Sequence, residues 1–325
     1  MRAGRIARGL LAALIAVVAM LALAVIAVWR DPYMIVRAEY ARQRIAAGLS
    51  LHAVEAAGYR WTYVERDADR ADAPTLVMLH GYTGSKENWY RLVQRLDRRY
   101  RIVVPDLPGW GQSERKPGAD YGYAAQAANV AAFIDVVSER PVVLVGHSMG
   151  GGIAAVTAAR YPDDVSRVAL LDASGVRFKD NRFGIDVLAG KNPFGVVDAA
   201  SLEHYLGILF HDRAARPAIP WPASKAVIDF RRGEGAFEQS VLDSVGRGPD
   251  RFLPYEAAVD IKQPALLLWC RQDQVIDASA LDIFGARMPQ ARRVLLDGCG
   301  HMSLMEQPAA VAQAIRALIE KGKPR

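Results

Sequence analysis

From residue 75 onwards the chain alternates short apolar runs with longer segments of helical periodicity. Continuous apolar runs of this length are typical of parallel strands covered on both faces. Two earlier runs, at 51–57 and 59–66, alternate polar and apolar residues across Gly58 and predict an antiparallel hairpin. The later predicted strands are 75–81, 101–107, 142–147, 167–173, 265–270 and 292–297, and the predicted helices are 86–98, 122–138, 149–160, 278–288 and 307–321. The pattern predicts an α/β fold with one doubly wound, eight-stranded, mostly parallel sheet.

The regular alternation stops between Gly175 and Lys262, where prolines and glycines separate shorter helical segments. These segments lie near 198–210, 223–231 and 236–245. Because a strand precedes this stretch and another follows it, we expect residues 175–261 to form a helical cap over the sheet edge. The core then consists of residues 50–174 and 262–325.

The most apolar stretch of the chain is residues 10–28, nineteen uncharged residues with the sequence LLAALIAVVAMLALAVIAV. As a helix it is about 28 Å long, close to the roughly 30 Å of a bilayer core. A cleaved signal peptide is the competing interpretation, because residues 22–24 have the small-x-small form of a cleavage site. The run is longer than a usual signal core. We therefore predict a transmembrane anchor at 1–30 and a juxtamembrane helix at 31–49.

The net charge of +6 comes from 41 Lys and Arg against 35 Asp and Glu, and it is concentrated near the N-terminus. Residues 1–30 hold four arginines and no acid, so the remainder carries 37 basic and 35 acidic residues. This near balance does not indicate a nucleic-acid partner. Arg2, Arg5 and Arg8 precede the apolar run and predict a cytoplasmic N-terminus. The rest of the chain is then expected on the periplasmic side of a bacterial inner membrane.

The strongest local signal is Gly-His-Ser-Met-Gly at 146–150, directly after the predicted strand 142–147 and before a small-residue helix. Glycines two positions either side of Ser148 allow a sharp strand-to-helix turn that lifts the serine Oγ above the sheet. The pattern alone is common, but its place between a strand and a helix makes it specific. Ser148 is the expected nucleophile, and a glycine-rich turn without chemistry is the alternative.

A serine hydroxyl needs a histidine base to act as a nucleophile at neutral pH. His301 follows the last predicted strand and is expected at the same sheet edge as Ser148. His80, which ends the strand 75–81, is expected to be structural, and the remaining histidines are His52, His147, His204 and His211. The chain has no H-E-x-x-H segment, and we expect neither a metal nor a cofactor.

The acid that orients the histidine must come from the same edge of the sheet. Asp273 follows the strand 265–270, which gives the chain order Ser148, Asp273, His301. Asp172 and Asp277 are weaker candidates, each with a structural role as the alternative.

An oxyanion needs backbone donors beside the nucleophile. The N–H of Met149 is the first candidate, and the N–H of Tyr82 in the loop 80–84 is the second.

Together these motifs resemble the α/β-hydrolase superfamily over nearly all of residues 50–322. The resemblance is carried by the serine turn at 146–150, the loop 80–84, the segment DLPGWGQS at 106–113, Asp273 and Gly300-His301. More narrowly, the segments 85–89, 267–269 and 299–301 and the anchor resemble membrane-anchored monoacylglycerol and lysophospholipid lipases, including bacterial inner-membrane phospholipases A. The resemblance implies an α/β-hydrolase fold with a helical cap, a lipid-facing acyl tunnel and a homodimer through the anchor and juxtamembrane helices.

Cys270 departs from the resemblance, since such families usually have glycine there. Cys270 ends a strand and Cys299 follows the next one, so their sulfurs are expected to be close. Two states are open, a disulfide in an oxidising periplasm or two buried free thiols, of which the thiols are the more common.

These observations predict a serine hydrolase that cleaves acyl esters of membrane lipids, with monoacylglycerol, lysophospholipid and intact phospholipid all open. A carbon–carbon bond hydrolase or an esterase for small soluble substrates is the alternative on the same scaffold. A non-catalytic binding module is disfavoured by the complete set of catalytic residue types. A haloalkane dehalogenase is disfavoured because its nucleophile is aspartate, where this chain has Ser148.

Overall fold

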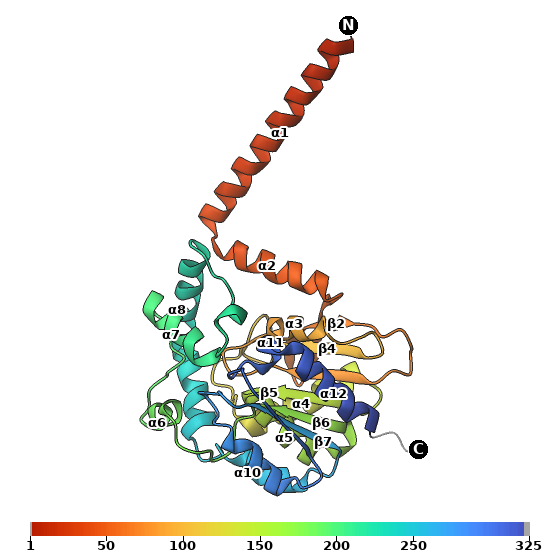
Figure 1. Ribbon diagram of the computed structural model, residues 1–325, viewed down its shortest axis with the longest axis vertical. Helices are drawn as coiled ribbons and strands as arrows, with labels where there is room; N and C mark the ends of the chain where they lie inside the picture. Colours follow the sequence, from red (N-terminus) through yellow and green to blue (C-terminus); the bar gives the residue numbers. More distant parts are fainter. Residues whose placement is uncertain (1, 322–325) are drawn as a thin grey trace.

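The computed structural model describes residues 2–321. Helix α1 (Arg2–Arg30) projects from the body of the protein, and α2 (Tyr33–Ala46) leads from it to the body (Figure 1). The apolar part of α1, Gly9–Arg30, is 22 residues long, and its length and composition are sufficient to cross a membrane. The predicted segments 1–30 and 262–325 include Met1 and residues 322–325, which lie outside the described residues.

The sheet has eight strands in the order β1-β2-β4-β3-β5-β6-β7-β8. The hairpin β1–β2 is antiparallel, β2 pairs antiparallel with β4, and all other pairs are parallel, which confirms the predicted mostly parallel sheet. Strands β3, β4 and β6 each end two residues before the predicted limit. The strands are β1 (Ser50–Ala56), β2 (Tyr59–Arg66), β3 (Thr75–Leu79), β4 (Arg101–Pro105), β5 (Val142–His147), β6 (Val165–Leu171), β7 (Ala265–Cys270) and β8 (Arg292–Leu296).

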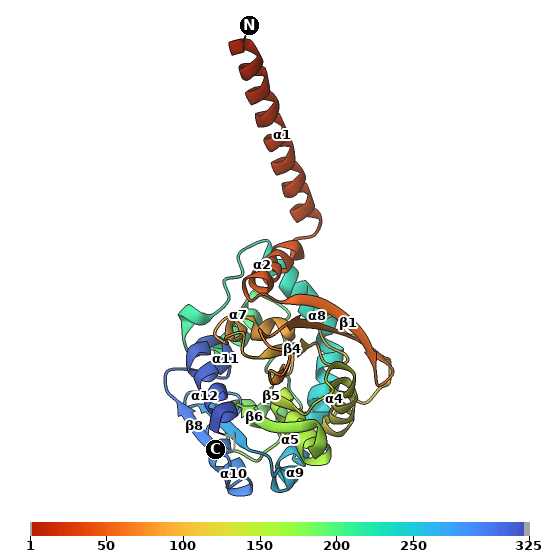
Figure 2. The same ribbon diagram turned by 90° about the vertical axis from the view of Figure 1, so that its right-hand side faces the viewer.

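Helices cover both faces of the sheet, as the continuous apolar strands require. Helices α4 and α5 pack together on one face, and α12 lies on the other (Figure 2), where it packs with α3. The core helices are α3 (Tyr90–Val93), α4 (Tyr123–Val137), α5 (Met149–Arg160), α10 (Ser279–Arg287), α11 (Ser303–Glu306) and α12 (Pro308–Lys321), with the short 3₁₀ turns η1 (Lys86–Trp89), η2 (Pro162–Asp164) and η5 (Ala258–Asp260).

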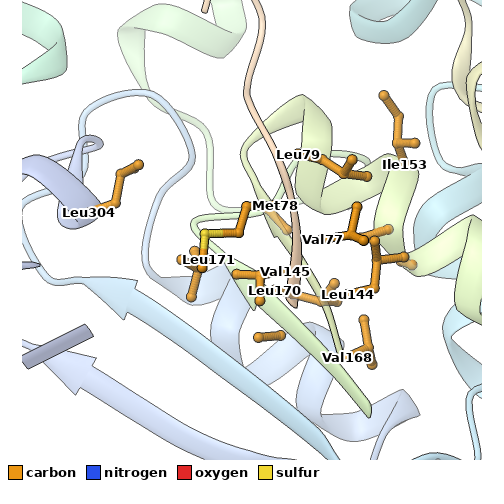
Figure 3. Close-up of a cluster of buried hydrophobic side chains, with 14 of the residues drawn as sticks. Val77, Met78, Leu79, Leu144, Val145, Ile153, Val168, Leu170, Leu171 and Leu304 are labelled. Carbon is orange, nitrogen blue, oxygen red and sulfur yellow. The ribbon is translucent and has the colours of Figure 1, made fainter. Parts of the chain in front are cut away.

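Of the central strands, β5 is buried along its whole length, and β3 and β6 are buried towards their carboxyl ends. Side chains of β3, β5 and β6 gather with Ile153 of α5 and Leu304 of α11 (Figure 3), and each labelled side chain is at most 1% exposed. Close packing of this kind resists displacement of the backbone. The loops at the carboxyl ends of these strands therefore start from fixed points.

The helix predicted over 86–98 is shorter in the structure. It consists of η1 and α3 and ends at Val93. The buried guanidinium of Arg66 donates to the carbonyl oxygens of Val93 at 3.0 Å, Leu96 at 3.0 Å and Asp97 at 3.1 Å. These bonds satisfy carbonyls at the helix end and beyond, so the chain can turn towards β4.

The cap helices α6 (Arg182–Leu188), α7 (Ala199–Leu209) and α8 (Ala223–Leu242) lie together on one side of the core (Figure 1). The cap also holds a 3₁₀ turn η3 (Arg213–Ala215) and a π-helical turn η4 (Asp243–Arg247). Helix α9 (Leu253–Ala257), near the end of the predicted cap segment, packs instead against the core helix α5. The helical segments predicted near 223–231 and 236–245 are joined in the structure, because α8 is continuous through Gly233 and Gly235. A buried ion pair between Arg231 and Glu238 spans the two glycines and links the helical turns on either side of them.

Candidate active site

Ser148 lies at the turn between β5 and α5 in a strained backbone conformation, with φ 53° and ψ −121°. A Cβ at Gly146 would lie 2.1 Å from the carbonyl oxygen of Gly150. A Cβ at Gly150 would lie 2.4 Å from the carbonyl oxygens of Leu79 and His80. Only glycine fits at either position, so the local sequence forces the sharp turn that presents the Ser148 side chain.

The structure brings Ser148, His301 and Asp273 together from the carboxyl ends of β5, β8 and β7. The Ser148 Oγ lies 2.9 Å from His301 Nε2, and His301 Nδ1 lies 2.8 Å from Asp273 Oδ2. All three side chains are buried. Burial lowers the pKa of His301 to about 3, which keeps the imidazole neutral at pH 7. Nδ1–H then donates to Asp273, and Nε2 is free to accept the serine proton.

Two further hydrogen bonds orient Asp273. Its Oδ1 accepts from the backbone N–H of Val275 at 2.7 Å and of Ile276 at 3.0 Å. With Oδ1 held by the loop, Oδ2 is the oxygen that faces His301. Asp277 has no hydrogen bond to His301 among residues 2–321; its Oδ1 accepts from the N–H of Ser279.

Asp172 is fully buried near this site, and no hydrogen bond joins it to His301 among residues 2–321. Its Oδ1 accepts from the N–H of Cys270 at 3.0 Å, and its Oδ2 accepts from the hydroxyl of Ser303. Burial and the neighbouring Asp273 raise the pKa of Asp172 well above its usual value. Asp172 therefore joins the chain just before Asp273 to the chain just after His301 as a structural support.

The loop that follows β3 lies directly beside Ser148. A Cβ at Gly81 would be 2.9 Å from the Cβ of Ser148. The carbonyl oxygen of Gly81 accepts from the His80 ring at 2.8 Å and from the N–H of Gly84 at 3.1 Å. Because the peptide unit is planar and trans, these bonds turn the N–H of Tyr82 in the opposite direction. The N–H groups of Tyr82 and Met149 donate no hydrogen bond to other groups of residues 2–321.

His80 and His147 support this arrangement from the core. The N–H of Leu107 donates to His80 Nε2 at 3.0 Å, so His80 donates through Nδ1. Burial lowers the pKa of His80 to about 4 and that of His147 to about 3. Neutral His147 donates from Nε2 to the carbonyl oxygen of His301 at 2.7 Å. The contribution of His147 is not visible in the sequence, since its only signal is its place beside Ser148.

A cavity of about 390 Å³ opens beside Ser148, between the sheet edge and the cap. Its wall is mostly aliphatic and aromatic, and three charged side chains, Arg177, Asp180 and Arg251, also line it. The apolar lining includes Met149, Phe178, Phe183, Val187, Leu188, Phe194, Leu242, Val245, Phe252 and Ile276. An apolar cavity that meets a nucleophile suits a substrate with a long hydrocarbon part.

Cys270 and Cys299 form a disulfide, with their Cα atoms 5.3 Å apart, so the free-thiol state that was the more common expectation is wrong. Both cysteines are fully buried. The bond follows from the pairing of β7 with β8, which sets Cys270 opposite Leu296, three residues before Cys299. It joins the loop that carries Asp273 to the loop that carries His301.

Removing this disulfide is expected to lower the free energy of unfolding by about 3.5 kcal/mol. The two cysteines are 29 residues apart, and closing a loop of that length restricts the unfolded chain by this amount. Urea unfolding of the oxidised protein in detergent, compared with a Cys270→Ala/Cys299→Ala variant, measures the difference. Equal midpoints for the two proteins, or two free thiols in denatured, unreduced wild type, would contradict the prediction.

Comparisons with known proteins agree with this geometry. A sequence model of the Alpha/beta hydrolase family matches residues 76–314. The chain is 28% identical over 292 residues to the monoacylglycerol lipase ABHD6 of Homo sapiens, covering 87% of this chain and 86% of the relative. It is 27% identical over 276 residues to Lipase 1 of Psychrobacter immobilis, covering 82% and 83%. The crystal structure of a membrane phospholipase A, a bacterial virulence factor, matches with a TM-score of 0.84 at 30% identity, covering 95% of this chain and 97% of that one.

Proposed function

The chain belongs to the alpha/beta hydrolase family, and on that premise we propose that it is a membrane-anchored serine hydrolase that cleaves acyl esters of membrane lipids. The observation that carries the proposal is the hydrogen-bonded series from Ser148 through His301 to Asp273 at the wall of an apolar cavity. The lipase and phospholipase relatives support the same class of substrate.

In the proposed reaction the Ser148 Oγ attacks the ester carbonyl carbon while His301 Nε2 takes the hydroxyl proton. The N–H groups of Tyr82 and Met149 bind the negative oxygen of the tetrahedral intermediate. His301 then protonates the leaving alcohol, and an acyl-enzyme remains on Ser148. A water molecule, deprotonated by His301, attacks the acyl carbon and releases the fatty acid. Asp273 holds the ring in the required tautomer and stabilises its positive charge.

The anchor supplies the reason for a lipid substrate. We propose that α1 spans a bacterial inner membrane with the catalytic domain on the periplasmic side, since three of its four arginines lie at its N-terminal end. A domain tied to a bilayer meets acyl esters at high local concentration. The homodimer through α1 and α2 remains part of the same proposal, and chemical cross-linking in membranes tests it.

The test is fatty-acid release by the full-length protein in detergent micelles. The substrates are a long-chain monoacylglycerol, a lysophospholipid, a diacyl phospholipid and a short soluble ester. We expect serine-dependent release from the lipids. Lengthening a monoester acyl chain by about four carbons should raise kcat/KM at least about tenfold, because each buried CH₂ contributes about 0.8 kcal/mol.

The control is the same protein inactivated by a fluorophosphonate, which reacts with an activated serine. Release from the short ester alone, with no gain from chain length, would reject a membrane-lipid substrate. It would favour instead a hydrolase for small soluble substrates on the same scaffold.

A further inference from the structure

The loop beside Ser148 is attached to the cap by two side-chain hydroxyls. The hydroxyl of Tyr82 donates to the carbonyl oxygen of Glu238 in α8, with the two oxygens 2.6 Å apart. The hydroxyls of Thr83 and Tyr205, which lies in α7, are 3.1 Å apart. Two neighbouring residues of one loop therefore contact two different helices of the cap.

The cap is built rigidly where it receives these hydroxyls. Arg231 and Glu238 form a bidentate ion pair with N–O distances of 2.8 and 3.1 Å, and their side chains are only 8% and 3% exposed. The Arg231 guanidinium also donates to the carbonyl oxygen of Phe194 at 3.0 Å and lies 4.5 Å from the centre of the Tyr205 ring. Separating a buried pair of this kind would leave two uncompensated charges in the interior, so the two side chains stay together.

A second hydrogen bond holds the Tyr82 hydroxyl in place. The side-chain amide of Asn192, between α6 and α7, donates to it at 3.2 Å. The Tyr82 ring packs against Trp110 on the core side, with centroids 5.4 Å apart, and against Phe194 on the cap side, with centroids 5.7 Å apart. The phenol is thus held between core and cap, and its position depends on both.

These contacts matter because Tyr82 also carries the second candidate oxyanion donor, its own N–H. The bonds to the Gly81 carbonyl fix the direction of that N–H from the core side. Thr83, the next residue, has a φ of 56°, a conformation that a β-branched residue adopts only when its surroundings impose it. The bond between Thr83 and Tyr205 supplies such a constraint from the cap.

We propose that the cap positions the oxyanion donor, with the Tyr82 and Tyr205 hydroxyls as positioning residues that hold the loop 81–84 against α7 and α8. The proposal rests on the proposed acyl-ester hydrolysis. Bonds to an oxyanion weaken when the donor moves, and removing such a donor outright costs roughly 10²- to 10³-fold in kcat. Loss of one distant support for the loop should cost less, about tenfold.

The proposal separates catalysis from binding. An oxyanion donor acts on the carbonyl that all esters share, so a displaced donor lowers kcat by the same factor for short and long acyl chains. A hydroxyl that only shaped the acyl cavity would change KM, and only for long chains. Tyr205 gives the cleaner test of the two, because it lies outside the residues that line the cavity.

The experiment compares Tyr82→Phe, Tyr205→Phe and the double variant with wild type, on one short soluble ester and one long-chain monoacylglycerol. We expect kcat to fall about tenfold for Tyr82→Phe and about threefold for Tyr205→Phe, with KM changed less than about twofold on both substrates. Thermal unfolding in detergent shows whether each variant is folded. The matched control is Tyr121→Phe, which removes another buried phenol hydroxyl, one bonded to the backbone of Lys116.

Unchanged kcat in folded Tyr82→Phe and Tyr205→Phe would overturn the positioning role, and so would a loss limited to KM for the long-chain ester. An equal loss of kcat in Tyr121→Phe would overturn it as well, because the effect would then be general. The failure of the proposed function is distinct, since it would appear as wild-type protein without serine-dependent hydrolysis of either ester.

Discussion

Alanine in place of Ser148 is expected to lower kcat by roughly 10⁴- to 10⁶-fold on every ester, the loss typical of a serine hydrolase without its nucleophile. The hydroxyl is the only group removed. The backbone hydrogen bonds of residue 148 do not involve its side chain. Its N–H donates to the carbonyl of Leu171 at 2.9 Å, and its carbonyl accepts from the N–H groups of Gly152 and Ser174 at 3.0 Å. The sharp turn should therefore persist, and thermal unfolding should change little.

A second substitution at the site should not lower kcat further. Ser148→Ala/His301→Ala is expected to be no less active than Ser148→Ala alone, because the two residues act as one unit. Ser166→Ala is the matched control, since the Ser166 hydroxyl donates to the carbonyl of Val142 at the amino end of the sheet. Turnover by Ser148→Ala at the wild-type rate would reject the mechanism.

The strands and the serine turn could be predicted because their signals are local. Glycine is required at 146 and 150 by atoms within a few residues or on the next strand, and the apolar runs reflect burial on both faces of the sheet. Chain order then predicts that Ser148, Asp273 and His301 meet at one edge, since parallel strands end there. Their catalytic roles stay predictions until the variants are measured.

The cap could not be predicted in the same way, because tertiary contacts determine it. In the sequence, Gly233 and Gly235 predict an interruption of the helix. In the structure α8 continues, because Arg231 and Glu238 pair in the interior across the two glycines. The link from Tyr82 to α8 joins residues 156 positions apart in the chain, and no local pattern marks it.

The cysteines show a different limit. Their proximity follows from strand pairing, which the order of the motifs predicts. Whether neighbouring cysteines form a bond depends on the compartment and on backbone geometry, which composition does not record.

The sequence offered three candidates for the acid, Asp273, Asp172 and Asp277. Substitution of the acid is expected to cause the second large loss of kcat. Asp273→Asn is expected to lower kcat about 10⁴-fold. The N–H groups of Val275 and Ile276 hold one oxygen of the side chain, so the amide oxygen of asparagine should take that place. The amide NH₂ would then face His301 Nδ1 and force the proton to Nε2, where it blocks transfer from Ser148.

Asp172→Asn is expected to lower kcat by less than about tenfold, the effect of altering one hydrogen bond. Asparagine keeps an oxygen that accepts from the N–H of Cys270, and its amide NH₂ takes the place of the oxygen that faces the hydroxyl of Ser303. It also tolerates the φ of 46° at this position, since its short polar side chain suits that region. Measuring kcat of both variants on one soluble ester separates the two carboxyls. The reverse ranking would move the acid to the end of β6, because the chain that orients His301 would then run through Asp172.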